Sequence, residues 1–145
     1  MAGYSGTPLP QKLGIKPGAR FGVVKPPADF GRALGALPAG VVAAAVSRGK
    51  LQFDVIVCFA PTMAEVARQL PALKPRLDPA GGLWMAWPKR ASGLATDVSE
   101  NAVRAVGLGA GLVDNKVCAI DEVWSGLRFV YRLVDRPAAS RSAKR

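Results

Sequence analysis

Gly81-Gly82-Leu83-Trp84-Met85-Ala86-Trp87-Pro88-Lys89-Arg90-Ala91-Ser92-Gly93 is the stretch that decides the fold of this chain. Its run at 83–87 has no polar side chain, which is typical of a strand buried on both faces of a sheet. Pro88 has no N–H to donate and should end that strand, and Lys89 and Arg90 follow at once. The stretch therefore predicts a core strand that delivers a basic loop to one edge of a sheet. In open α/β folds, ligands bind at that edge.

The composition predicts a globular protein. The chain has 145 residues, half of them hydrophobic, which suits one domain with a sizeable core. No apolar run approaches the ~20 residues of a membrane helix, and the N-terminus lacks the apolar core of a signal peptide. We therefore expect a cytoplasmic protein without membrane contact.

Two residue types limit the possible chemistry. The sequence contains no histidine, which excludes Ser-His and Cys-His nucleophiles and histidine-based metal sites. Cys58 and Cys118 lie in apolar runs without metal or redox spacing, so we expect buried free thiols.

Positive charge exceeds negative charge by a factor of two. The chain has 20 Lys and Arg against 10 Asp and Glu, which gives a net charge of +10. Residues 136–145 carry four cations, no acid and too few apolar groups to fold, so they predict a disordered basic tail after a domain at 1–135. Such a tail either attracts phosphate backbones or only keeps the protein soluble.

Alternating apolar segments predict the order of strands and helices. Strands are expected over residues 20–24, 40–46, 54–60, 83–87, 113–120 and 127–134. Helices are expected over residues 30–37, 62–70 and 97–106. Strand and helix alternate up to Gly107, which implies parallel strands with right-handed crossovers. The last two strands are joined by too few residues for a crossover and must be antiparallel.

Local signals refine these boundaries. Thr62 with Glu65, and Asp97 with Glu100, have the spacing of a capping box at a helix N-terminus. Gly107 suits a C-terminal cap. Pro71 and Pro75 should end the second helix, and residues 78–82 should form a turn before the central strand.

A mostly parallel sheet finished by an antiparallel hairpin resembles the three-layer architecture of Rossmann-like methyltransferases. Residues 13–18 and 77–83 look like the segments that lead into two strands of that family. A closer resemblance covers nearly all of residues 2–134 and is to the bacterial family called domain of unknown function 3052. It rests on residues 3–9, 87–93 and 117–129. This resemblance implies the fold and no activity.

The chain departs from working methyltransferases where they bind their cofactor. Their first strand leads into a glycine-rich loop, whereas this sequence has Lys25-Pro26-Pro27-Ala28-Asp29, in which two prolines remove two N–H donors. Their next strand ends at an acid that holds the ribose, but Ser47 and Arg48 stand at that place here. We therefore expect neither S-adenosylmethionine nor a conventionally bound dinucleotide, and no other cofactor is predicted.

The carboxyl ends of the predicted strands share one edge, which gathers a candidate site. Its residues are Lys25, Arg48, Lys89, Arg90, Ser92, Asp121, Glu122, Trp124 and Ser125. One hypothesis is a pocket for an anionic ligand, with Lys89 and Arg90 as counter-charges and Trp124 as a stacking surface. The other is internal ion pairing of the two acids with the two cations. As catalysts, the acids alone are a weak signal.

The leading functional hypothesis is a non-catalytic, methyltransferase-like module that binds an anionic small molecule or nucleic acid. A transferase with altered cofactor use and a structural protein-interaction module are the alternatives. Arg128 and Arg132 share one face of the last predicted strand. We interpret them as a solvated face or a helix contact rather than as a nucleic-acid track.

Overall fold

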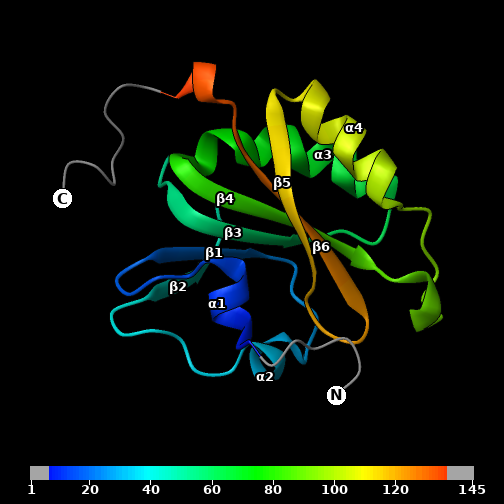
Figure 1. The fold of residues 1–145 in the computed structure, drawn as a ribbon, viewed down its shortest axis with the longest axis horizontal. Coiled ribbons are helices and arrows are strands. Elements are labelled where there is room, and N and C mark those ends of the chain that lie inside the picture. Colours follow the sequence, from blue (N-terminus) through cyan, green and yellow to red (C-terminus); the bar gives the residue numbers. More distant parts are fainter. Residues whose placement is uncertain (1–6, 137–145) are drawn as a thin grey trace.

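The computed structural model describes residues 7–136, which form one six-stranded sheet with helices on both faces (Figure 1). The strand order is β2-β1-β3-β4-β6-β5. The strands are β1 (Arg20–Val24), β2 (Val42–Ala45), β3 (Phe53–Phe59), β4 (Leu77–Pro88), β5 (Leu112–Ala119) and β6 (Trp124–Tyr131). Strands β1 to β4 are parallel, and β6 runs antiparallel to both β4 and β5. The predicted mixed sheet with its C-terminal antiparallel hairpin is confirmed.

Two layers of helices cover this sheet. The helices are α1 (Leu9–Leu13), α2 (Phe30–Leu34), α3 (Met63–Leu73) and α4 (Glu100–Gly109), with short 3-10 turns at Lys74–Arg76, Arg90–Ser92 and Leu133–Asp135. Figure 1 places α3 and α4 on one face and α1 and α2 on the other. We call these the α3 face and the α1 face. None of these helices is long and apolar enough to span a membrane. Of the predicted tail, only Arg136 lies within the described residues.

Each face of the sheet has its own hydrophobic core. On the α3 face, Ile56, Leu70 and Phe129 are among the fully buried residues. On the α1 face, Trp84 is fully buried and donates its indole N–H to the Leu13 carbonyl at 3.0 Å. This hydrogen bond attaches α1 to the centre of the sheet and satisfies the one polar atom of a buried indole.

Strand β4 lies at the centre and is longer than predicted. The run at 83–87 is buried as expected, but the turn predicted at 78–82 is wrong, because the strand begins at Leu77. Phe53 pairs with Leu77 and Val55 pairs with Gly82, so β4 bulges against β3. The residues read as a turn form this bulge, within which the Asp78 carboxylate accepts the Ala80 N–H at 2.9 Å.

The first half of the sheet has one crossover without a helix. Residues 46–52 connect β2 to β3 as a loop, contrary to the predicted alternation, and the predicted strand at 40–46 shortens to the exposed edge strand β2. Val46 folds back over β1 at Gly22, where an added Cβ would lie 2.6 Å from Val46 Cγ2. Because Gly22 has no side chain, the loop that contains Val46 can pack on β1 in place of a crossover helix. Arg76 holds this loop by donating to the Leu51 carbonyl at 2.8 Å.

Two helix ends also differ from the prediction. Pro71 lies inside α3, which continues to Leu73, because it removes only the hydrogen bond to a carbonyl on the exposed side of the helix. The cap of α4 is Ser99, whose hydroxyl accepts the Ala102 N–H at 3.2 Å. Asp97 instead accepts the Met63 N–H at 2.8 Å, at the start of α3.

Half of the predicted capping box of α3 is confirmed, since the Thr62 hydroxyl accepts the Glu65 N–H at 3.2 Å. The Glu65 carboxylate instead accepts hydrogen bonds from Lys25 and Arg68. The helix predicted at 30–37 already ends at Leu34, where Gly35 adopts a φ of 72°. The last strand starts three residues earlier than predicted, because a tight turn, closed by the Ile120 N–H to the Trp124 carbonyl at 2.9 Å, joins it to β5.

Gly107 lies inside α4 and does not cap it. An added Cβ there would lie 2.0 Å from the Phe129 ring, whereas nothing lies within 4 Å of the same position on Gly109. In an open helix, Gly→Ala stabilises by about 1 kcal/mol. We expect Gly107→Ala instead to destabilise the protein by about 1–3 kcal/mol through overpacking.

Urea unfolding of Gly107→Ala and the matched control Gly109→Ala measures this difference. The control should be neutral or slightly stabilising. If both variants gain stability, α4 does not approach β6 as closely as described.

Candidate functional site

The strand order reverses between β1 and β3, and their carboxyl ends form the switch point at which doubly wound sheets bind ligands. Lys25 follows β1 with a φ of 51°, a left-handed conformation that is uncommon without glycine. Its Nζ lies 3.0 Å from Glu65 Oε2 on α3, and Arg68 contacts Glu65 Oε1 at 2.5 Å. The hydrogen bond from Arg68, followed by that from Lys25, lowers the pKa of Glu65. Lys25 is therefore paired and does not serve as a free counter-charge.

The structure brings Lys89 and the turn at 121–124 to the same edge. Lys89 Nζ donates to the Asp121 carbonyl at 2.8 Å, and the Lys89 N–H donates to the Val123 carbonyl at 2.7 Å. The Asp121 carboxylate accepts the N–H groups of Val123 and Trp124, each at 2.8 Å. Lys89 is thus bound to a backbone carbonyl, and the acid stabilises its own turn.

The ion pairing predicted for this edge does not form. Among residues 7–136, no salt bridge joins Lys89 or Arg90 to Asp121 or Glu122. Arg90 and Glu122 are exposed to solvent. The reason is local geometry, since the Lys89 ammonium and the Asp121 carboxylate are both used on the backbone.

The remaining predicted residues have local structural contacts or lie elsewhere. Trp124 contacts Phe59 edge to face, with ring centroids 5.1 Å apart, and so belongs to the aromatic core. The Ser92 hydroxyl donates to the Lys89 carbonyl at 2.6 Å, and Ser125 of β6 is paired with Trp87 of β4. Arg48 follows the edge strand β2 and is separated from β4 by β1 and β3.

A hollow of about 280 Å³ lies beside this predicted rim. Its lining residues are Asp29, Arg32, Ala33, Asp121, Glu122 and Val123. Three acids and one cation make it unfavourable for an anion. In the described part of the chain, no cluster of three or more Cys, Asp or Glu side chains is arranged to hold a metal ion.

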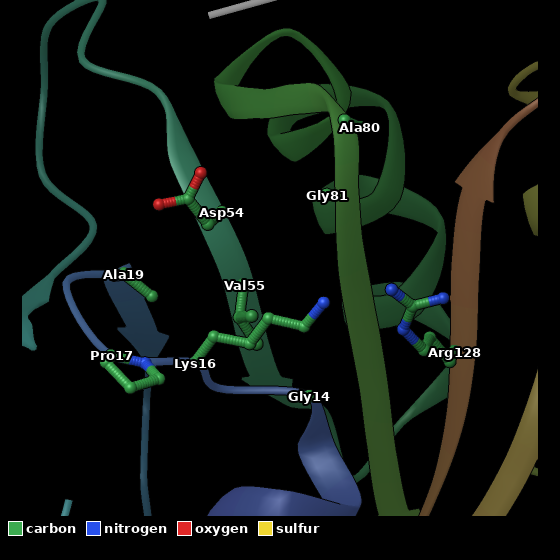
Figure 2. Close-up of a pocket in the computed structure, with 9 residues that line it drawn as sticks. All are labelled: Gly14, Lys16, Pro17, Ala19, Asp54, Val55, Ala80, Gly81 and Arg128. Atoms are coloured by element: carbon green, nitrogen blue, oxygen red, sulfur yellow. The ribbon is translucent and has the colours of Figure 1, made fainter. Parts of the chain in front are cut away.

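A second cavity, of about 400 Å³, lies near the opposite, amino-terminal edge of the sheet. Figure 2 shows Lys16 and Arg128, from opposite sides of β4, directing their charged ends toward each other. The Asp54 carboxylate in the same cavity points away from them and accepts the Arg20 N–H at 2.8 Å. Sequence reasoning missed this site because Gly81 and its neighbour were interpreted as a turn.

The sequence predicted either a solvated face or a helix contact for Arg128, and the structure shows that this side chain is only partly exposed. It is half-buried, and burial is the main cause that lowers the pKa of its guanidinium, followed by the charge of Arg136. It donates one hydrogen bond, at 3.3 Å, to the Asn115 side chain. The useful sequence signal was its alternation with Leu127 and Phe129, which places Arg128 on the α1 face over Gly82.

Further cations connect this cavity to the carboxyl-terminal edge. Lys12 Nζ donates to the Ala119 carbonyl at 3.0 Å, and Lys116 Nζ donates to the Lys12 carbonyl at 3.2 Å. Burial raises the pKa of Cys118, whereas the charges of Lys12, Lys116 and Lys89 lower it. Lys116 is also the register partner of Arg128. We call this set the basic track, comprising Lys12, Lys116, Arg128 and Arg136.

Lys89 and Arg90 should respond differently to removal of their side chains. Lys89→Ala leaves the Asp121 carbonyl without its donor and should destabilise the protein by about 0.5–1.5 kcal/mol. Arg90→Ala, the exposed neighbour, should change the free energy of unfolding by less than about 0.5 kcal/mol. Denaturant unfolding of both variants measures this, and equal effects would show that the Lys89 contact contributes no stability.

Three solved structures are similar to this chain at low sequence identity. A possible exported protein from Bordetella parapertussis gives a TM-score of 0.59 at 13% identity and covers 84% of this chain and 64% of its own. A SAM-dependent methyltransferase from Aquifex aeolicus gives 0.58 at 14% identity, with coverages of 82% and 85%. The M1A22 tRNA methyltransferase TrmK from B. subtilis gives 0.55 at 13% identity, with coverages of 87% and 66%.

This chain spans somewhat less than two thirds of the length of the Bordetella and B. subtilis proteins. No family model matches its sequence, and no curated protein matches it either, so membership of domain of unknown function 3052 stays a prediction. The strand order and the structural similarity agree, and the chain has the fold of Rossmann-like S-adenosylmethionine-dependent methyltransferases.

Proposed function

We propose that this chain is a non-catalytic module with a methyltransferase fold that binds nucleic acid along the basic track. The observation that carries the proposal is the gathering of Lys12, Lys116 and Arg128 on the α1 face of the C-terminal hairpin. Lys12 comes from α1, whereas Lys116 and Arg128 come from the β5–β6 hairpin, which follows much later in the sequence. The fold, rather than a local run of basic residues, assembles the track.

The charges near the track favour a polyanion. Residues 115–119 of β5 contain no acid, and Asp114 before them is paired with Arg104 of α4 at 2.9 Å. The whole chain carries a net charge of +10, which adds long-range attraction for phosphate backbones. Contacts of this kind position a protein on nucleic acid without reading its sequence. TrmK, which has this fold, is a tRNA methyltransferase, so the fold is compatible with an RNA-binding surface.

The switch point supports the non-catalytic part of the proposal. Pro26 and Pro27 supply no N–H groups to a cofactor there, and Lys25 is held by Glu65. Strand β2 ends at Ala45, and Arg48 rather than an acid follows it. A cofactor that needs a ribose-binding acid and a bare glycine loop would find neither in this region. The rim residues Arg48 and Arg90 are exposed and can add contacts to phosphates outside the track.

The salt dependence of binding tests the proposed function. Fluorescence anisotropy with a labelled duplex DNA should give a linear fall of log K with log salt concentration. Lys116→Ala removes one exposed phosphate contact and should reduce that slope by about 0.9. Lys50→Ala is the matched control, because Lys50 is equally exposed but lies between β2 and β3, away from the track.

The control should leave the slope unchanged. Equal reductions for both variants would show that only net charge matters and that no track exists. Absence of binding at low salt would contradict the proposed function itself. Deletion of residues 137–145, which lie outside the described part of the chain, measures the separate contribution of the predicted tail.

A further inference from the structure

We infer that the cavity between Lys16 and Arg128 is a binding site for a phosphomonoester, supplied by a nucleotide or by the phosphorylated end of a strand. The inference rests on the proposed function and assigns a specific role to one end of the basic track. It places this site at the amino-terminal edge, away from the switch point where proteins of this fold class bind their ligands.

Arg128 has fewer hydrogen-bond partners among the described residues than a buried guanidinium normally has. A guanidinium has five N–H donors and is seldom buried without a carboxylate partner. Among the described residues, Arg128 makes one hydrogen bond, to Asn115 at 3.3 Å, and no salt bridge. Burial and the charge of Arg136 both disfavour its charged form. An anion bound in the cavity would offset both effects and use the remaining donors.

The floor of the cavity is bare backbone of β4. An added Cβ on Gly82 would lie 2.3 Å from Arg128 Nε, so the guanidinium lies against bare backbone of β4. Beside it, an added Cβ on Gly81 would lie 2.4 Å from the Asp54 carbonyl oxygen. Larger residues at these positions would displace Arg128 or separate β4 from β3. The bare backbone at Gly82 thus lets the half-buried guanidinium lie against β4, which favours a binding site over a fully exposed surface arginine.

Lys16 supplies a second cation from the other side. Its side chain extends from the loop between α1 and β1 toward β4 and Arg128 (Figure 2). Arginine offers a planar fork to two phosphate oxygens, and lysine offers a compact charge to a third. A phosphomonoester carries close to two negative charges at neutral pH, because its second pKa is about 6. Two cations on opposite sides therefore match a monoester better than a singly charged phosphodiester.

The size of the cavity fits this class of ligand. Its volume of about 400 Å³ lies within the range of roughly 300–1,000 Å³ that is typical of small-molecule sites. The Asp54 carboxylate lines the cavity but points away from the gap between the two cations (Figure 2). A phosphate in that gap would therefore meet two cations and no opposing carboxylate directed at it.

The test compares two fluorescent single-stranded oligonucleotides that differ only in a 5′-phosphate or a 5′-hydroxyl. The wild-type protein should bind the phosphorylated strand about tenfold more tightly, which is the effect of one charge-assisted hydrogen bond. Arg128→Gln and Lys16→Ala should each abolish this preference. Lys16 is exposed and outside the core, so its variant keeps the test valid if Arg128→Gln lowers the melting temperature.

Lys116→Ala is the matched control. It should weaken both oligonucleotides equally and preserve the preference, because Lys116 belongs to the track but does not line the cavity. Adenosine monophosphate as a competitor then identifies the source of the phosphate. Displacement of the phosphorylated strand supports a site that a free nucleotide can fill, and retention of that strand with the preference intact supports a site for strand ends.

Two results would overturn the inference. Equal affinity of the wild-type protein for both strands, with Arg128→Gln weakening both in parallel, would make Arg128 an ordinary member of the track. The proposed function would then stand without the phosphomonoester site. Failure of the wild-type protein to bind either strand or duplex DNA would contradict both proposals.

Discussion

The backbone of β4 carries no side chain at Gly81 and Gly82, and the rest of the sheet depends on this constraint. At Gly81 the strand approaches the Asp54 carbonyl of β3 so closely that no Cβ fits. At Gly82 it leaves space for the guanidinium of Arg128, which comes from β6 on the other side. Residues 83–86 of β4, which follow the bulge and these glycines, pair with both β3 and β6 and so join the parallel half of the sheet to its antiparallel hairpin.

This construction gives the two edges of the sheet different properties. At the carboxyl-terminal edge, Lys25 is paired with Glu65, and Lys89 holds the turn after β5 through a carbonyl. At the amino-terminal edge, Lys16 and Arg128 face a cavity. The fold of the methyltransferases is therefore retained, while Lys25 and Lys89 at their ligand-binding edge are used for internal contacts. We propose that binding has moved to the α1 face and the amino-terminal edge.

The sequence predicted the fold better than the site. Hydrophobic runs such as 83–87 identify buried strands, and the short connection before β6 requires an antiparallel hairpin, so the topology follows from local pattern. The prediction failed where tertiary packing overrides local signals. Gly107 signals a helix end but serves close packing against Phe129, and Asp97 caps α3 rather than α4.

The roles of the residues in the candidate site could not be predicted for a related reason. Topology does bring Lys89 near Asp121, but the sequence cannot tell whether the ammonium contacts a carboxylate, a carbonyl or a ligand. Likewise, the interpretation of Arg128 as a solvated face or a helix contact rested on its charge and on its face of the strand. It did not include Gly82 beneath it, which belongs to a different strand and is brought there only by the register of β4 and β6.

The central claim, that binding occurs on the α1 face and not at the switch point, is tested most directly by backbone amide NMR spectra. The protein is titrated separately with duplex DNA and with S-adenosylmethionine. Our account predicts that DNA shifts the signals of Lys116, Arg128 and their neighbours in β5 and β6, and that S-adenosylmethionine shifts none. Saturable shifts of the Lys25 and Met63 amides with S-adenosylmethionine would contradict it.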